Sequence, residues 1–483
     1  MTIRRTKIVA TLGPATTSPE VLEKLILAGV NVVRLNFSHG NADDHKARAK
    51  LVRELAAKHD RYIAIMGDLQ GPKIRIGCFK NKRIELKEGD IFRLSVSYPK
   101  DAGTQEIVGI DYEDLVNDCD VGDVLLLDDG RVIMKVIERK SDELVCKVEV
   151  GGPLSDHKGI NRSGGGLTAP ALTEKDKRDI LLATEMKVDY LAVSFPRSGA
   201  DMDHARRLAK EAGSHAWLVA KIERAEAVAD DEALDGLIHA SDAVMVARGD
   251  LGVEIGNAEL VGIQKKIIQF ARRNNKAVIV ATQMMESMIN SPMPTRAEVL
   301  DVANAALDNT DAVMLSAESA SGHYPVEAVK AMARICEGAE KNPLSTRSGY
   351  RMEREFTRCD ETIGISAVFA ANHFPGVKVI AALTETGFSP LIMSRLRSAL
   401  PIYAFTPNAE TQTRVALFRG VYTVPFDANS YEPNEINKAV VDELLKRNIV
   451  EKGDWIVVTV GDRYHGTGGT NTLKILRAGD KIA

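Results

Sequence analysis

The sequence lacks the features by which several large classes of protein are recognised. Its 483 residues carry a formal net charge of -4 with no basic tail or arginine-rich block, which argues against a nucleic-acid or anionic-membrane partner. No apolar run approaches the length of a membrane span, and no apolar segment follows the start, Met-Thr-Ile-Arg-Arg-Thr-Lys, as in a secretion signal. We therefore expect a cytoplasmic protein that binds neither nucleic acid nor membrane.

Two further absences limit the chemistry. The five cysteines are odd in number, scattered and never in a CxxC spacing, so they predict reduced thiols rather than a disulfide framework or a thiolate metal site. No Walker motif and no GxGxxG motif accompanies a strand, a turn and a helix. Any nucleotide must therefore be held by another arrangement of residues.

Hydrophobic periodicity divides the chain into three parts. Apolar strand-like runs alternate with amphipathic helical stretches over residues 1–70, and the alternation resumes over residues 171–343. Residues 71–170 show only short β-rich runs and turns, with Gly71-Pro72 at the entrance and Gly164-Gly165-Gly166 at the exit. We interpret this segment as a small β-barrel domain inserted into the alternating part.

The alternating part predicts an α/β fold. Without the insertion it contains eight strand–helix units, the count of a (β/α)8 TIM barrel, and an open doubly wound sheet is the alternative. Eight regular units favour closure. Residues 344–483 begin with a polar loop and then return to strands and helices, which predicts a separate C-terminal α/β domain.

Polar side chains follow the predicted barrel strands where each strand ends, which is where barrel enzymes carry their active sites. In the strand 216–223, alternate residues share a face, so Lys221 and Glu223 project together. One such pair alone indicates only a solvated charge pair. The pattern recurs, however, at the ends of other strands, with Arg34, Asn36 and Ser38; Asp68; Arg248, Gly249 and Asp250; Thr282 and Gln283; and Ser316 and Glu318.

These residue types suit phosphoryl transfer. Glu223 and Asp250 are too few for a calcium site but suit Mg2+ or Mn2+, which keep water ligands and bind through one or two carboxylates. Lys221 and Arg34 add positive charge, which the spreading negative charge of a transferred phosphoryl group requires. Gly249 allows close approach of the backbone, so main-chain N–H groups there are candidates for holding a substrate carboxylate.

Six motifs make the chain resemble the pyruvate kinase family, in order and nearly from end to end. They are Asn36-Phe-Ser-His-Gly40, Gly71-Pro-Lys-Ile-Arg75, Lys221-Ile-Glu223, Met245-Val-Ala-Arg-Gly-Asp-Leu-Gly252, Ala281-Thr-Gln-Met-Met-Glu-Ser287 and Pro294-Thr-Arg-Ala-Glu298. The resemblance implies that the inserted domain is a lid and the C-terminal domain is regulatory. It also implies a glycolytic enzyme, usually a homotetramer, that transfers the phosphoryl group of phosphoenolpyruvate to ADP, giving pyruvate and ATP.

The resemblance also implies roles at the reaction centre. Lys221 is expected to neutralise the phosphoryl group during transfer, and Arg34 to contact it. Glu223 and Asp250 are expected to bind the divalent metal.

Further roles concern the rest of the substrates. The main-chain donors of Gly249 and Asp250, with Thr282, are expected to hold the substrate carboxylate. Thr282 is also expected to help deliver the proton that makes pyruvate, directly or through water. The residues expected on the nucleotide side are Asn36, His39, Arg75 and Lys158.

One departure from the family pattern bears on cofactors. Potassium-dependent members carry Gly-Pro-Glu at the lid entrance and a threonine after the aspartate of the third strand, where this chain has Gly71-Pro72-Lys73 and Leu69. An ammonium group near Asn36, Ser38 and Asp68 would supply the charge of a bound K+. We expect activity that needs no K+, and the alternative is that Lys73 only extends into solvent at a hinge.

The C-terminal part contains a candidate anion site. The loop 384–389 joins a predicted strand to a helix, so Thr384, Thr386, Gly387 and Ser389 offer hydroxyl and N–H donors. The loop 465–470 is a second glycine-rich segment that would fold over it, and plain turns are the alternative for both. The resemblance implies a phosphorylated allosteric effector here, and the sequence leaves open fructose 1,6-bisphosphate, a sugar monophosphate and AMP.

Two other functions fit parts of the pattern. A metal-dependent aldolase or lyase on a phosphoenolpyruvate/pyruvate barrel would share the carboxylate pair and an arginine, but would lack Lys221 and the lid-borne Arg75 and Lys158. A catalytically silent metabolite sensor would bind an effector without turnover. The presence of Lys221, Thr282 and the metal pair argues against it.

Overall fold

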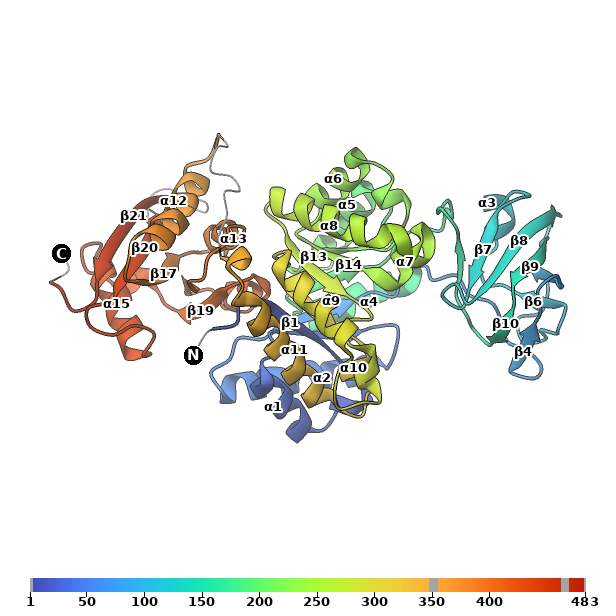
Figure 1. Ribbon diagram of the computed structural model, residues 1–483, viewed down its shortest axis with the longest axis horizontal. Helices are drawn as coiled ribbons and strands as arrows, with labels where there is room; N and C mark the ends of the chain where they lie inside the picture. The colour runs from blue at the N-terminus through green and yellow to red at the C-terminus, as the bar shows by residue number, and fades with distance from the viewer. Residues whose placement is uncertain (1–2, 347–354, 462–468, 482–483) are drawn as a thin grey trace.

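The computed structural model describes residues 3–346, 355–461 and 469–481, which form three regions in a row (Figure 1). The middle region is a closed barrel of parallel strands in the order β1-β16-β15-β14-β13-β12-β3-β2. The strands are β1 (Lys7–Leu12), β2 (Val32–Asn36), β3 (Ala64–Asp68), β12 (Tyr190–Val193), β13 (Trp217–Ile222), β14 (Ala243–Ala247), β15 (Ala277–Ala281) and β16 (Ala312–Leu315). The predicted (β/α)8 barrel is confirmed, and the open sheet is excluded.

Helices cover the outside of the barrel, and several begin at side-chain caps. Ser18 caps α1, Thr173 and Asp176 form a reciprocal capping box at α4, and Thr295 and Glu298 form another at α9. The barrel helices are α1 (Pro19–Ala28), α2 (Ala42–Lys58), α4 (Glu174–Glu185), α5 (Gly199–Glu211), α6 (Asp231–Ala240), α7 (Arg248–Ile255), α8 (Asn257–Arg273), α9 (Arg296–Leu307), α10 (Ala317–Ala320) and α11 (Pro325–Glu340). Short 3-10 turns are η1 (Pro14–Thr16), η2 (Glu226–Val228), η3 (Glu286–Ile289) and η4 (Pro343–Ser345).

The inserted domain follows β3 and lies at one end of the molecule (Figure 1). A six-stranded sheet runs in the order β11-β7-β8-β9-β5-β6, and β10 pairs with β4. Apolar side chains from both sheets share one buried core. The strands are β4 (Arg83–Leu86), β5 (Ile91–Ser95), β6 (Ile107–Gly109), β7 (Val124–Leu127), β8 (Val132–Arg139), β9 (Glu143–Val150), β10 (Gly152–Ser155) and β11 (Ile160–Arg162). The helix α3 (Leu115–Asp118) has only four residues, in line with the β-rich pattern.

The C-terminal domain lies at the opposite end and contains a five-stranded sheet in the order β19-β18-β17-β20-β21 (Figure 1). Its elements are α12 (Cys359–His373), β17 (Val377–Leu383), α13 (Phe388–Ser394), β18 (Ile402–Thr406), α14 (Ala409–Arg414), η5 (Val415–Leu417), β19 (Val421–Pro425), η6 (Ala428–Ser430), α15 (Ile436–Lys446), β20 (Trp455–Gly461) and β21 (Thr470–Arg477). The sequence did not predict β21, an antiparallel edge strand. Most of its side chains are partly or fully exposed, so it lacks the apolar run by which the other strands are recognised.

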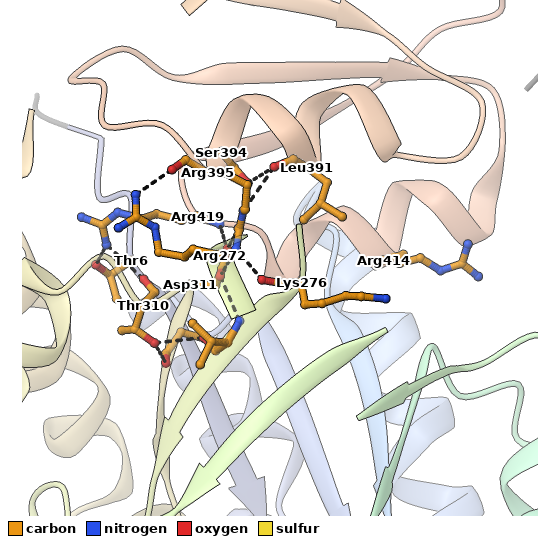
Figure 2. A network of polar contacts seen from close by, with 12 residues as sticks. Thr6, Arg272, Lys276, Thr310, Asp311, Leu391, Ser394, Arg395, Arg414 and Arg419 are labelled. Carbon is orange, nitrogen blue, oxygen red and sulfur yellow. Dashed lines mark hydrogen bonds and ion pairs between the residues drawn. The ribbon is translucent and has the colours of Figure 1, made fainter. Parts of the chain in front are cut away.

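A buried polar network joins the C-terminal domain to the amino ends of the barrel strands (Figure 2). Its centre is Asp311, which precedes β16 and is fully buried. Asp311 accepts hydrogen bonds at 2.9 Å from the N–H groups of Val278 and Arg419. Arg395 Nη1 donates to the same carboxylate at 2.8 Å, and Arg272 donates to the Arg395 carbonyl at 2.7 Å. Because this carboxylate is shared between the two domains, it fixes how they pack.

Two properties concern the chain as a whole. Within the three described ranges, no helix combines the length and apolarity needed to cross a membrane. All five cysteines are free thiols; Cys119, Cys146 and Cys336 are buried, Cys78 is half-buried and Cys359 is exposed.

Candidate active site

The strand β13 places Lys221 and Glu223 at the carboxyl end of the barrel. Glu223 directly follows the last residue of β13, and its Oε1 lies 2.9 Å from Lys221 Nζ. The same ammonium donates to Ser194 Oγ at 2.7 Å and lies 3.4 Å from Asp68 Oδ1. Only 12% of the Lys221 side chain is exposed, so the ammonium is a fixed charge among groups from three strand ends.

Burial and neighbouring charges set the protonation of this cluster. Burial raises the pKa of Glu223 to about 7; Lys221 opposes this rise, and Asp250 adds to it. For Lys221, burial lowers the pKa, but the carboxylates of Asp68 and Glu223 outweigh burial and hold it above its ordinary value. Burial likewise raises the pKa of Asp68, and the cations Arg34 and Lys221 bring it below the ordinary value. The ammonium therefore stays charged at neutral pH.

A second fixed cation lies beside the first. Arg34, in β2, pairs through Nε with Asp68 Oδ2 at 2.5 Å, so Asp68 contacts both Arg34 and Lys221. Arg34 Nη1 also donates to Thr11 Oγ1, in β1, at 3.2 Å. One carboxylate, at the end of β3, thus aligns a cation on the adjacent strand β2 with a cation on β13, two strands away on the other side.

The turn after β15 holds Thr282 in an unusual backbone conformation. Thr282 and Gln283 have φ of 67° and 54°, in the left-handed region that non-glycine residues rarely adopt. Two groups hold this conformation. The Gly249 N–H donates to Thr282 Oγ1 at 2.8 Å, and the Arg248 guanidinium donates to the carbonyls of Thr282 and Gln283 at 2.7 and 3.1 Å. The hydroxyl of Thr282 is therefore positioned by its surroundings.

Asp250 lies in the first turn of α7, which begins directly after β14. Its Oδ1 is 3.3 Å from Lys73 Nζ. Among the described residues, the ion pair of Lys73 is with Asp250 and not with Asp68, beside which we expected the ammonium. Lys73 therefore brings its charge to the same site from the β14 side. The side chains of Lys73 and Asp250 are 28% and 22% exposed, so neither extends freely into solvent.

The donor set at this site fits a divalent metal that keeps water ligands. In the described part of the chain, no group of three or more His, Cys, Asp and Glu side chains has a metal-binding arrangement. Calcium and zinc sites are closed by more protein ligands than Glu223 and Asp250 supply, whereas Mg2+ and Mn2+ bind through one or two carboxylates. Burial is the main cause of the raised pKa of Glu223, with a smaller contribution from Asp250, and a cation bound between these carboxylates would favour their ionised forms.

The four residues expected on the nucleotide side divide between the carboxyl end of β2 and the inserted domain. Asn36 is the last residue of β2, and its Oδ1 accepts the Ser38 N–H at 3.1 Å; His39 follows in the next turn and is exposed. Arg75 and Lys158 lie in the inserted domain. Arg75 donates to the His157 carbonyl at 2.8 Å, and Lys158 Nζ is 2.7 Å from Asp128 Oδ1.

The expected effector loop lies in the C-terminal domain and runs from the end of β17 into the first turn of α13, where Ser389 lies. The Gly387 N–H donates to Thr384 Oγ1 at 3.0 Å, and Gly387 has a φ of 85°. The buried hydroxyl of Ser389 is 2.6 Å from that of Thr470, while Thr386 is half-buried. Most of the second glycine-rich loop, 465–470, lies outside the described residues.

Sequence reasoning missed two polar side chains of this site. Thr11, near the end of β1, accepts from Arg34, and Ser194 directly follows β12 and accepts from Lys221. Both lie at strand ends, so the rule that selected the other residues would have found them. The helix α7 was also missed, because its first turn was interpreted as a loop.

The fold and this cluster together define a class of enzyme. A closed (β/α)8 barrel brings Lys221 and Arg34 together with carboxylates at the carboxyl ends of its strands. This arrangement is that of a barrel phosphotransferase, which stabilises a transferred anion with fixed cations and a divalent metal.

Comparison with known proteins identifies the family. The family model "Pyruvate kinase, barrel domain" matches residues 3–329, and "Pyruvate kinase, alpha/beta domain" matches residues 361–476. Pyruvate kinase II of Salmonella typhimurium is 56% identical over 474 residues, or 98% of each chain, and a pyruvate kinase of Haemophilus influenzae is 55% identical over 97% of each chain. A crystal structure of a pyruvate kinase from Cryptosporidium parvum superimposes with a TM-score of 0.91 at 34% identity, covering 98% of this chain and 96% of that one. The chain belongs to the pyruvate kinase family and is an enzyme with that activity.

Proposed function

We propose that this enzyme transfers the phosphoryl group of phosphoenolpyruvate to ADP at the site around Lys221, giving pyruvate and ATP. The observation that carries the proposal is the buried Lys221 ammonium, held by Glu223, Asp68 and Ser194. A cation fixed before the reaction stabilises the phosphoryl group in transfer without reorganising. Arg34 contacts the phosphoryl group as the second fixed cation, aligned by Asp68.

Glu223 and Asp250 are the proposed ligands of Mg2+ or Mn2+. Held by these two carboxylates, the ion would supply positive charge that stabilises the negative charge developing during phosphoryl transfer. The support is the donor set itself, two carboxylates at neighbouring strand ends with one of them buried. The cation binds more tightly to the ionised form of Glu223 than to the protonated form.

The substrate carboxylate is assigned to the first turn of α7. N–H groups in a first turn have no intrahelical acceptor, so those of Gly249 and Asp250 are suited to an anion. Thr282 supplies a third donor. Its hydroxyl accepts the Gly249 N–H at 2.8 Å and donates to the Ala281 carbonyl at 2.7 Å, so binding of the carboxylate redirects both the Gly249 N–H and the Thr282 hydroxyl toward the substrate. After phosphoryl transfer, this hydroxyl delivers a proton to the enolate carbon, directly or through water.

We assign the nucleotide to the space between the barrel, residues 1–70 and 171–343, and a lid formed by residues 71–170. Asn36 and His39 contact it from the barrel, and Arg75 and Lys158 from the lid. The support is where these residues lie. Asn36 and His39 are on the barrel, whereas Arg75 follows the entrance of the lid and Lys158 precedes its exit. The Arg75 guanidinium donates to the His157 carbonyl through Nη1, and the Lys158 ammonium pairs with Asp128. Each cation has several N–H donors, so others of them are suited to phosphate oxygens.

Lys73 is proposed to replace K+. Its ammonium already pairs with Asp250, next to the proposed metal position, so one positive charge is supplied by the chain itself. In tetramethylammonium buffer, we expect addition of KCl to change kcat by less than about twofold, and we expect Lys73→Glu to make activity rise with KCl. A large stimulation of the wild-type enzyme by KCl would refute the proposal.

The C-terminal domain, residues 344–483, is proposed to bind a phosphorylated effector at the loop containing Thr384, Thr386, Gly387 and Ser389. The support is the cluster of hydroxyl and N–H donors there. Saturation curves for phosphoenolpyruvate with fructose 1,6-bisphosphate, sugar monophosphates and AMP identify the effector by the one that shifts the curve. A cytoplasmic homotetramer is proposed from the family resemblance, and sedimentation at assay concentration tests the tetramer.

A coupled assay with lactate dehydrogenase tests the reaction. The proposal predicts pyruvate formation from phosphoenolpyruvate only when ADP and Mg2+ are present. Pyruvate release without ADP would instead indicate a lyase, and effector binding without turnover would indicate a sensor.

A further inference from the structure

The segment that leaves the inserted domain, residues 161–167, runs along the loop that follows β13. Its three consecutive glycines have φ of 81°, 81° and 97°, in the region that favours glycine. The Gly164 N–H donates to the Glu254 carbonyl at 3.0 Å, and the Gly166 N–H donates to Glu226 Oε1 at 2.6 Å. Two main-chain donors therefore attach this exit segment to the barrel.

Glu254 joins three parts of the molecule. It lies in α7, the helix whose first turn carries Asp250, and it is only 3% exposed. Its Oε2 accepts the Ala225 N–H, just after β13, at 2.8 Å. Its Oε1 accepts from Asn161 of the exit segment at 3.4 Å and lies 3.5 Å from Arg224 Nε. Through its side chain and its carbonyl, Glu254 thus contacts both the exit segment and the loop after Glu223.

Arg224 and Glu226 complete the arrangement. Arg224, which directly follows Glu223, is 4% exposed; it donates to the Leu167 carbonyl at 2.8 Å and to Glu226 Oε1 at 3.0 Å. The Glu226 carboxylate contacts the exit segment so closely that a Cβ at Gly165 would lie 2.7 Å from it. We name Arg224, Glu226 and Glu254 the exit clamp.

Arg224 and Glu254 are buried charges, and burying a charge costs free energy. A buried ion pair gains little over apolar residues of the same volume, while losing one partner is strongly destabilising. Its best-supported use is to specify one arrangement of the groups it joins. Here those groups are the exit segment, the residue after Glu223 and the helix of Asp250.

We propose that the exit clamp sets the position of the inserted domain relative to Glu223 and Asp250, so that Arg224, Glu226 and Glu254 are positioning residues for phosphoryl transfer to ADP. The inference rests on the proposed function of the site. Arg75 and Lys158 lie on the inserted domain, so a displaced exit segment moves the nucleotide contacts away from the phosphoryl group. A small misplacement of this kind reduces the rate strongly.

Gly165→Ala and Gly164→Ala form a matched test. Both glycines have a φ of 81°, so an alanine meets the same backbone strain at each position. A Cβ at Gly165 displaces the Glu226 carboxylate, whereas at Gly164 it meets no atom within 4 Å. Relative to Gly164→Ala, we expect Gly165→Ala to raise KM for ADP by about fivefold and lower kcat by about tenfold, with KM for phosphoenolpyruvate within about twofold. Equal kinetic parameters for the two variants would overturn the proposal.

Glu254→Gln is the second test, because it removes the charge with little change of shape. Glu259→Gln, on an exposed position of α8, is its control. We expect the same shift in KM for ADP in Glu254→Gln and none in Glu259→Gln, with circular dichroism and melting temperature confirming folding. An unchanged KM for ADP and kcat in Glu254→Gln would overturn the clamp. If the wild-type enzyme itself showed no ADP-dependent transfer, the proposed site chemistry would fail instead.

Discussion

Individual side chains at this site are held by partners that do not touch the substrate in the proposed mechanism. Asp68 aligns Arg34 with Lys221, and Arg248 fixes the backbone of Thr282 and Gln283. The left-handed conformation of Thr282 is intrinsically unfavourable, so it persists because these hydrogen bonds over-determine it. The positions of the reacting groups therefore depend on residues one contact further away.

Arg248→Lys tests this dependence. A lysine cannot reproduce the forked contacts of the guanidinium with two carbonyls and with Asp301, which Arg248 Nη1 contacts at 2.7 Å. We expect kcat to fall by about 10- to 100-fold, with KM for phosphoenolpyruvate within about threefold. Exchange of the methyl protons of pyruvate with solvent should fall in parallel, since it uses the same hydroxyl.

The control is Arg207→Lys, because Arg207 is an exposed arginine of α5. It should leave both rates unchanged. If Arg248→Lys exchanged pyruvate protons at the wild-type rate, Arg248 would not position the proton donor.

At the scale of secondary-structure elements, the two ends of the barrel strands have different roles. Carboxyl ends carry the active site, whereas amino ends meet the C-terminal domain. At the start of β1, Lys7 is only 2% exposed, donates to the Val421 carbonyl of β19 at 2.5 Å and lies 4.0 Å above the Tyr422 ring. Burial, with a smaller contribution from Arg4, lowers the pKa of Lys7 from 10.5 to about 7.

This burial predicts a stability that depends on pH. The unfolded chain holds the proton of Lys7 up to about pH 10.5, while the folded chain releases it near pH 7, so the folded state gains stability as pH rises between these values. The slope is at most about 1.4 kcal/mol per pH unit. The Lys7→Met variant lacks this pH-dependent contribution. Any excess in its folding stability over that of the wild-type enzyme should therefore shrink as pH rises.

The measurement is the melting temperature of both proteins at pH 7, 8 and 9. The difference between the two melting temperatures should move steadily in favour of the wild-type enzyme. A difference that stays constant over this range would show that Lys7 keeps its proton in the folded state.

For the molecule as a whole, the sequence predicted what depends on local pattern. The alternation of apolar runs predicted the barrel strands, and the capping boxes at Thr173 and Thr295 are formed by residues three positions apart, so they too depend on local sequence. Strand alternation alone put Lys221 and Glu223 on one face, where they lie 2.9 Å apart. The positions of strands and helices, and which residues share a face of a strand, depend on short stretches of sequence. They can therefore be predicted from one sequence.

Contacts between distant segments could not be predicted in this way. Lys73 pairs with Asp250 across 177 residues, and no local pattern in the sequence relates the two positions. The pairing of Asp311 with Arg395 depends on how two domains pack, and neither residue belongs to a recognisable motif. The exit clamp depends on the same kind of long-range placement. These interactions are set by tertiary packing, which local sequence patterns do not predict.

Lys221 is the residue on which the proposed reaction depends most, and Lys221→Met removes its charge while keeping most of its length. Phosphoryl transfer and Mn2+ binding should be measured on the same preparation. We expect kcat to fall by about 10³-fold or more, because the phosphoryl group in transfer loses its fixed cation, and Mn2+ affinity to stay within about threefold, because Glu223 and Asp250 remain. Near-normal turnover in the folded variant would contradict the assignment of Lys221.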